Sequence, residues 1–140
     1  MILLIDNYDN ADVIQIIQLH GQESDEMIET LRERTDCEIW KAFKVRCKED
    51  LDRALQSKAD FVILDNGYGT GETFDWSLIG QFGRPFALAG GLNPDNMAEA
   101  VKTLSPSLLD LSSGVETEKI KDKNKIMQAV KLAHSCDIKE

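Results

Sequence analysis

The chain has 140 residues, 42% of them apolar and 29% charged, which is enough to bury one hydrophobic core, so we expect a single domain over 1–140. Its net charge of −9 argues against nucleic-acid binding, and no apolar run approaches the roughly 18 residues of a membrane span. The acidic start is unlike a signal peptide, and we expect Cys37, Cys47 and Cys136 to be reduced thiols of a cytoplasmic protein. An anionic small molecule stays possible as a ligand if local donors hold it.

The opening apolar run, "ILLID", ends at Asp6, and the next run begins at Ile16. About nine residues separate the two, which is fewer than the dozen or so that a parallel crossover needs. Either this connection is abnormally short, or the first strand pairs elsewhere, for instance with another chain. We therefore expect residues 1–12 to form an atypical N-terminal strand and loop.

The rest of the chain alternates between short apolar runs and helical patterns. The runs predict strands at 16–20, 38–43, 61–65, 86–90 and 108–113. Helical patterns lie between and after them, with Ser24 and Asn93 as expected N-caps, Pro94 at a first helical position, and Ile126, Met127 and Val130 on the apolar stripe of the last helix. Strict alternation of this kind predicts a parallel sheet with right-handed crossovers.

Glycine-rich turns follow the last two predicted strands. Gly90 and Gly91 precede the helix that opens with Asn93–Pro94, and Ser113 and Gly114 lie in the next turn, "SSGVE". Such turns expose backbone N–H groups that bind phosphate, although each could also be a mere tight turn. Two adjacent turns at the ligand-binding end of a sheet favour a phosphate site.

Three other polar residues end or lie within predicted strands. Asp65 closes the apolar run "FVIL", where partial desolvation suits a carboxyl group to general acid work, unless it only caps a turn. Asp110 lies inside "LLDLSS", where a charge needs a polar cavity or a structural hydrogen bond. His20 could contact a ligand or be structural, and the glycine-rich stretch 67–76 could be a lid or a plain loop.

These strings together resemble the phosphoribosylanthranilate isomerase family of tryptophan biosynthesis. The matching pieces are "IQLHG", "WKAFKV", "VILD", "GTGETFDW", "LAGGLNPDNMAEAV", "LDLSSGVE" and "KIKDKNKI". The resemblance spans residues 13–131, most of this chain, and corresponds to the C-terminal portion of the family, strands four to eight. The resemblance implies an α/β fold, an incomplete (βα)8 (TIM) barrel with five to six parallel strands and alternating helices.

The resemblance also implies an activity and residue roles. The family performs an Amadori rearrangement, in which N-(5-phosphoribosyl)anthranilate isomerises to 1-(2-carboxyphenylamino)-1-deoxyribulose 5-phosphate. Carried over by motif, Asp65 is the catalytic general acid, and His20 and Asp110 line the substrate pocket. The phosphate falls on Gly90, Gly91, Ser113 and Gly114, and no metal or cofactor is implied.

One catalytic part of the family pattern has no counterpart in this sequence. The family opens with a strand reading Lys-Ile-Cys-Gly, whose cysteine is the general base, and that string does not occur here. Cys47 could act as a surrogate base, but a position at the start of a helix is the plainer interpretation. We expect no turnover without the strands that supply the base.

Three hypotheses for function follow from the sequence. The first is an isomerase portion that acts on a phosphorylated small molecule once the missing strands are supplied. The second is a non-catalytic remnant that still binds phosphate, and the third is a flavodoxin-like binding or interaction module. Because a partial barrel exposes sheet edges, we expect a homo-oligomer or a complementing chain.

Overall fold

The computed structural model describes residues 2–6, 14–65 and 76–136. Its strands are β1 (Ile2–Asp6), β2 (Ile14–Leu19), β3 (Glu38–Lys44), β4 (Phe61–Asp65), β5 (Phe86–Ala89), β6 (Leu108–Asp110), β7 (Glu116–Thr117) and β8 (Ile120–Lys121). Its helices are α1 (Asp25–Arg34), α2 (Lys48–Gln56), α3 (Met97–Leu104) and α4 (Lys123–Ser135), with short 3₁₀ turns η1 (Trp76–Leu78) and η2 (Ser113–Val115). Of the stretch considered as a lid, only Trp76 is among the described residues.

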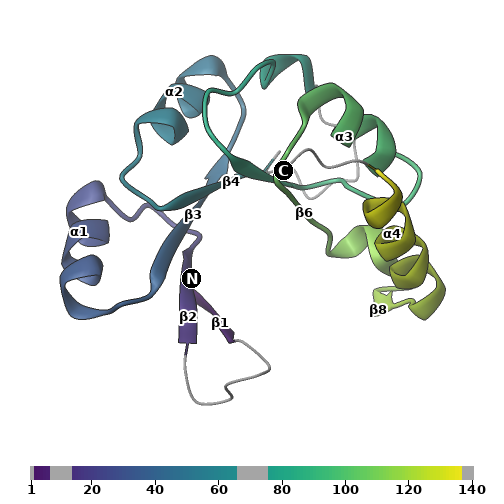
Figure 1. The fold of residues 1–140 in the computed structure, drawn as a ribbon, viewed down its shortest axis with the longest axis horizontal. Helices are drawn as coiled ribbons and strands as arrows, with labels where there is room; N and C mark the ends of the chain where they lie inside the picture. Colours follow the sequence, from purple (N-terminus) through teal and green to yellow (C-terminus); the bar gives the residue numbers. More distant parts are fainter. Residues whose placement is uncertain (1, 7–13, 66–75, 137–140) are drawn as a thin grey trace.

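The main sheet has six strands in the order β1-β2-β3-β4-β5-β6. The five strands from β2 to β6 are parallel, each paired with its neighbours in the chain. The sheet curls, and the four helices lie along its outer, convex side (Figure 1). The predicted partial barrel is therefore confirmed. The strand order also contradicts the flavodoxin-like alternative, because doubly wound sheets reverse their strand order part-way.

The first strand pairs with the second one in the same chain. β1 runs antiparallel to β2, from Ile2 opposite Leu19 to Asp6 opposite Ile14. Antiparallel neighbours need only a hairpin connection, so the link that was too short for a parallel crossover is long enough here. Neither alternative drawn from the sequence, an abnormal crossover or pairing with another chain, describes this strand.

The two faces of the sheet bury different sets of side chains. The outer face packs Leu19, Ile39, Leu64 and Leu88 against the helices in the main core. The inner face carries a smaller cluster in which Ile63, Ala87 and Ala89 are buried and Trp40, Ala42 and Phe61 are partly buried. Because side chains alternate along a strand, each strand contributes to both layers, and its last residue on the inner face lies at the edge where a ligand would bind.

The helix starts follow the sequence pattern, with one displacement. Ser24 caps α1 by accepting from the amide of Met27 at 3.4 Å, as expected. The third helix begins at Met97, later than predicted, because Asn93 first caps a separate turn. The Asn93 side chain accepts from the amides of Asp95 and Asn96, and its carbonyl accepts from Met97.

The apolar stripe of α4 is exposed. Ile126, Met127 and Val130 are 39%, 61% and 51% exposed, whereas Ala129 is buried against Met97 and Val115. The stripe lies at the side of the molecule where the sheet ends with β6, and no element of the described chain covers it.

The hairpin of β7 and β8 turns at Glu118 and Lys119, which both have positive φ values, of 53° and 66°. Positive φ at both central residues is the conformation of a tight type I′ turn, which favours Asn and Gly.

Candidate functional site

The strand register brings three charged residues into one row on the inner face. Lys44 of β3 lies opposite Asp65 of β4, Asp65 opposite Ala89 of β5, and Ala89 opposite Asp110 of β6. All are the last residues of their strands, so they form the carboxyl edge of the inner face. Asp65 is half-buried, and Lys44 and Asp110 are exposed. The structure thus places two of the predicted site residues at the same height, two strands apart.

The two glycine turns meet beside this row. Gly90 and Gly91 directly follow β5 and have φ values of 85° and 66°, a region that side-chain-bearing residues rarely adopt. Gly114 lies in η2 after β6, so close to the first turn that an added Cβ would be 1.8 Å from the carbonyl oxygen of Leu92. Glycine is therefore required at 114 by backbone contact between the two turns.

Asn93 and Asn96 fix the shape of the first turn. The Asn96 side chain donates to the carbonyl of Gly91 at 2.9 Å and accepts from the amide of Asn93 at 2.9 Å. Asn93 accepts from the amides of Asp95, Asn96 and Met97, and Pro94 has no N–H, so the amides of residues 95–97 are used within this turn.

A small cavity of about 300 Å³ lies between the second turn and the start of α3. Ser113, Gly114, Asn93, Lys125 and Gln128 are among its lining residues. The Lys125 ammonium donates to the carbonyl of Glu116 at 2.6 Å, which holds a positive charge near the turn.

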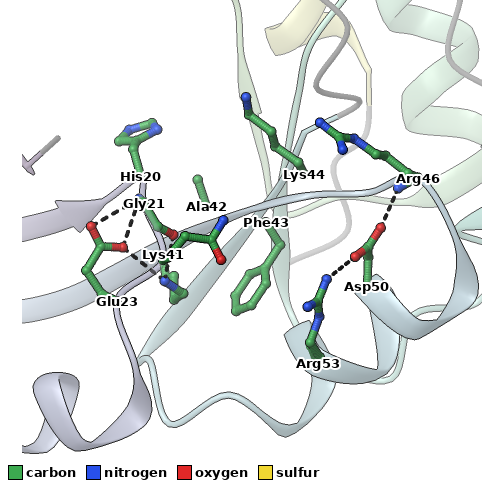
Figure 2. Close-up of a pocket in the computed structure, with 11 residues that line it drawn as sticks. His20, Gly21, Glu23, Lys41, Ala42, Phe43, Lys44, Arg46, Asp50 and Arg53 are labelled. Atoms are coloured by element: carbon green, nitrogen blue, oxygen red, sulfur yellow. Dashed lines mark hydrogen bonds and ion pairs between the residues drawn. The ribbon is translucent and has the colours of Figure 1, made fainter.

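His20 lies at a different cavity, next to β3. This cavity, of about 400 Å³, is lined by the loop after β2 and by residues at and after the end of β3, Lys44 and Arg46 among them (Figure 2). In Figure 2 the side chains of His20, Ala42 and Lys44 project to one side of β3, while Lys41 and Phe43 project to the other. Within the described residues, His20 and the Ser113–Gly114 turn therefore line separate cavities. The lining residues of these two cavities do not include Gly90, Gly91, Asp65 or Asp110.

A buried ion pair holds the loop that carries His20. Lys41 reaches from the outer face of β3 to the Glu23 carboxylate at 3.0 Å and to the carbonyl of Gly21 at 3.2 Å. Glu23 in turn accepts from the amide of Gly21 at 2.8 and 3.1 Å. Burial raises the pKa of Glu23, but hydrogen bonds from backbone amides and from Lys41 outweigh it and leave that pKa below its usual value.

The model of the N-(5'-phosphoribosyl)anthranilate (PRA) isomerase family matches residues 5–132 of this sequence. The chain belongs to that family. It is 45% identical over 139 residues to the N-(5'-phosphoribosyl)anthranilate isomerase of Endomicrobium trichonymphae, an alignment that covers 94% of this chain and 68% of the relative.

Solved isomerase structures share the fold. One is a phosphoribosyl anthranilate isomerase in complex with reduced 1-(o-carboxyphenylamino)-1-deoxyribulose 5-phosphate, with 36% identity and a TM-score of 0.72 over 87% of this chain and 60% of that one. Another shows mutually generated monomers of the dimeric enzyme from Thermotoga maritima, with 35% identity and a TM-score of 0.73 over 87% and 61%. The chain thus spans about three-fifths of the length of these isomerases.

Cys47, considered as a substitute for the cysteine base of the isomerase family, lies at the start of α2. Its amide and its thiol donate to the Asp50 carboxylate at 3.2 and 3.4 Å, and it is the residue that precedes the helix. A hydrogen bond with Glu49 raises the pKa of the Cys47 thiol, and the Asp50 carboxylate adds to the rise. Because the thiolate is the reactive form, this site disfavours a base at Cys47.

The sequence places Lys41 to Lys44 at the end of a predicted strand, where a ligand would bind, but it assigns them no role. It does not identify the pairing of Lys41 with Glu23 or the contacts of Asn96. A lysine within the apolar run "EIWKAF" was the available signal for Lys41, since a charge at a core-facing strand position needs a partner. In the part of the chain that the structure describes, no group of three or more His, Cys, Asp and Glu side chains could hold a metal ion. No helix there is long and apolar enough to cross a membrane.

Proposed function

We propose that this chain forms the phosphate-binding and general-acid portion of a phosphoribosylanthranilate isomerase. The substrate is N-(5-phosphoribosyl)anthranilate, and the product is 1-(2-carboxyphenylamino)-1-deoxyribulose 5-phosphate. The observation that carries the proposal is the row on the inner face, in which Asp65 and Asp110 stand at one height beside the glycine turns after β5 and β6. A related structure, 36% identical, is a complex with a reduced form of that product.

Asp65 acts as the general acid in this proposal. It gives its proton to the ribose ring oxygen while the bond between that oxygen and C1 breaks, and the anilino nitrogen becomes a protonated Schiff base. A base then removes the proton from C2, and the resulting enol becomes the ketone. Amides of Gly90, Gly91, Ser113 and Gly114 hold the phosphate, while His20 and Asp110 line the pocket for the rest of the substrate.

The base for the second step comes from strands outside the matched three-fifths of the isomerases. Cys47 does not supply it, because its thiol pKa is raised and it is engaged with Asp50. A second polypeptide, or another part of a longer chain, pairs with the free edge of β6 and brings the base to the row.

An apolar groove along that edge supports the need for a neighbour. It has a volume of about 650 Å³ and is lined by β6, η2 and α4, with Leu108, Ile126 and Val130 exposed within it. A bare strand edge beside exposed apolar side chains favours association. Sedimentation should show a dimer at micromolar concentration, or a one-to-one complex when the complementing strands are added. A monomer under both conditions would contradict this part of the proposal.

A fluorescence turnover assay with phosphoribosylanthranilate tests the activity. We expect turnover only when the chain is mixed with the N-terminal portion of the Endomicrobium relative. Asp65→Asn should lower the rate in the mixture by at least about 100-fold, because it removes a general acid. Asp52→Asn is the matched control, since Asp52 is exposed on α2, and it should leave the rate unchanged.

Other outcomes of the same assay decide between hypotheses. Turnover by the chain alone would show that it contains its own base and would contradict the account of Cys47. No turnover in the mixture, with phosphate still bound by folded protein, would favour a phosphate-binding module without catalysis.

A further inference from the structure

We propose that β1 is a removable cap on a second docking edge of the sheet, and that a parallel strand of the complementing polypeptide takes its place beside β2. The inference rests on the proposed function, in which such a polypeptide pairs with β6 and supplies the base. It starts from the two ends of the sheet. In the described part of the chain, β6 ends the sheet on one side with an unpaired edge, whereas on the other side β1 pairs with β2.

The direction of β1 sets it apart from the rest of the sheet. The strands from β2 to β6 are parallel, and a closed (βα)8 barrel consists of eight parallel strands. A strand that completes the barrel next to β2 therefore has to run parallel to β2. Because β1 runs antiparallel to β2, it occupies the position that a strand of the complement needs.

The pairing of β1 leaves none of that edge open. It extends from Ile2 opposite Leu19 to Asp6 opposite Ile14, and Ile14 and Leu19 are the two ends of β2. A strand has two edges, and β3 occupies the other edge of β2. The complement can therefore pair with β2 only after β1 has left.

The contacts of β1 are few enough for it to be replaced. Among the described elements, β2 is the only one that β1 contacts extensively, and Figure 1 shows β1 at the end of the sheet, away from the four helices. The register is also interrupted between Ile5 and Asp6, where β2 contains one extra residue, and such a bulge disrupts the ladder locally. A two-stranded pairing without further cover is marginally stable in water, so a strand held by a larger complement can displace it.

The same pairing has a use while the complement is absent. An open strand edge pairs readily with other chains, and proteins cover such edges to avoid aggregation. With β1 in place, the edge of β2 is covered until a strand that fits the barrel replaces β1. β1 thus has two states, paired with β2 in the separate chain and released in the complex.

A reversible lock tests the inference in the full chain. Ile5 lies opposite Ile16, and opposite residues of an antiparallel pair are about 4.5–5.5 Å apart at Cα, within the range of a disulfide. Ile5→Cys combined with Ile16→Cys should therefore form a disulfide that keeps β1 on β2, which peptide mass mapping verifies. In a calorimetric titration with the N-terminal portion of the Endomicrobium relative, the reduced form should bind at least about ten-fold more tightly than the oxidised form. The reduced form is the matched control, because it contains the same two substitutions.

Leu3→Pro combined with Leu4→Pro tests the opposite direction. Successive residues of a strand direct their amides to opposite sides, so two consecutive prolines remove a hydrogen bond to β2 whichever amide faces it. If the released state is populated at most about 10% in the unaltered chain, making it the main state should tighten binding of the complement about ten-fold or more. Leu3→Val combined with Leu4→Val keeps both amides and should bind the complement like the unaltered chain.

Equal affinity of the oxidised and reduced forms for the complement would overturn the inference. So would a Leu3→Pro, Leu4→Pro variant that folds but binds no more tightly than the variant with two valines. In either case, turnover of phosphoribosylanthranilate by the mixture would leave the proposed function intact. If the folded chain binds no complement in any of these forms, the proposed complementation fails, and the inference fails with it.

Discussion

Replacing Gly114 with alanine should break the contact between the two glycine turns. The new Cβ would lie 1.8 Å from the carbonyl oxygen of Leu92, 2.8 Å from its carbonyl carbon and 3.0 Å from the Cα of Asn93. All three are backbone atoms, so no side chain can rotate away to make room. Since real Cβ contacts essentially never fall below 3.0 Å, the turns must separate by about 1.2 Å.

That separation has two consequences of different size. Forcing one extra carbon into a packed site costs about 1–3 kcal/mol of unfolding free energy, which a domain of this size can tolerate. At the proposed phosphate site the effect should be larger, because amides of both turns must converge on one anion there. Loss of even one charge-assisted hydrogen bond of about 1.5–3 kcal/mol lowers the affinity at least tenfold.

Urea unfolding and a phosphorus NMR titration with the reduced product measure the two effects separately. Gly83→Ala is the matched control, because the nearest atom to its added Cβ is the flexible Leu55 Cδ1 at 3.3 Å. The control should keep both its stability and its affinity. If Gly114→Ala stays within 0.5 kcal/mol of the unaltered chain, on the scale of ordinary surface substitutions, and binds the ligand equally well, the proposed junction of the turns is refuted.

Three further predictions concern stability. Lys41→Met leaves the Glu23 carboxylate buried without its cation and should lower the free energy of unfolding in urea by about 3 kcal/mol. Adding Glu23→Gln should recover part of that loss, and an unchanged free energy of unfolding in Lys41→Met would show that the ion pair is not needed. The pKa of Glu23 in the folded chain lies below its ordinary value of 4.5. The carboxylate therefore stabilises the fold above pH 4.5, and this stabilisation is lost as the pH falls through the pKa of the folded state. The stability difference between the unaltered chain and Glu23→Gln should accordingly shrink below about pH 4.5. Lys119→Gly should raise the unfolding free energy by about 0.5–1 kcal/mol, since it relieves a positive φ at the cost of a more flexible unfolded chain, and an unchanged midpoint in urea would contradict the strain at this turn.

The sequence predicts best where the structure depends on neighbours in the chain. The strand predicted at 61–65 has the same limits as β4, because a short continuous apolar segment between polar residues is typical of a buried strand. Ser24 caps α1 for an equally local reason. The third helix begins later than predicted because Asn93 can cap either a helix or a separate turn. The separate turn forms here, with the Asn96 amide donating to the Asn93 side chain and the Asn96 side chain donating to the carbonyl of Gly91.

Contacts between distant segments were beyond the reach of the pattern. The pairing of Lys41 with Glu23 crosses from β3 to the loop after β2, and periodicity shows only that a charge lies at a core-facing position. The Gly114 contact with Leu92 likewise joins two turns that the sequence predicts separately. The exposed stripe of Ile126 and Val130 could not be foreseen from a helical pattern, because burial depends on what lies beyond β6.

The arrangement separates what a partial barrel can do from what it cannot. Each parallel strand is aligned by its neighbour, so the register from Lys44 through Asp65 to Asp110 needs no closed barrel. The glycine turns are likewise held by residues within 90–114. In the proposed function, ligand binding at this edge therefore requires only local structure, whereas proton removal at C2 requires a group from the complementing strands. An added complement should consequently change the turnover rate far more than the affinity for the phosphate, and a large gain in phosphate affinity would mean that the cradle is itself incomplete.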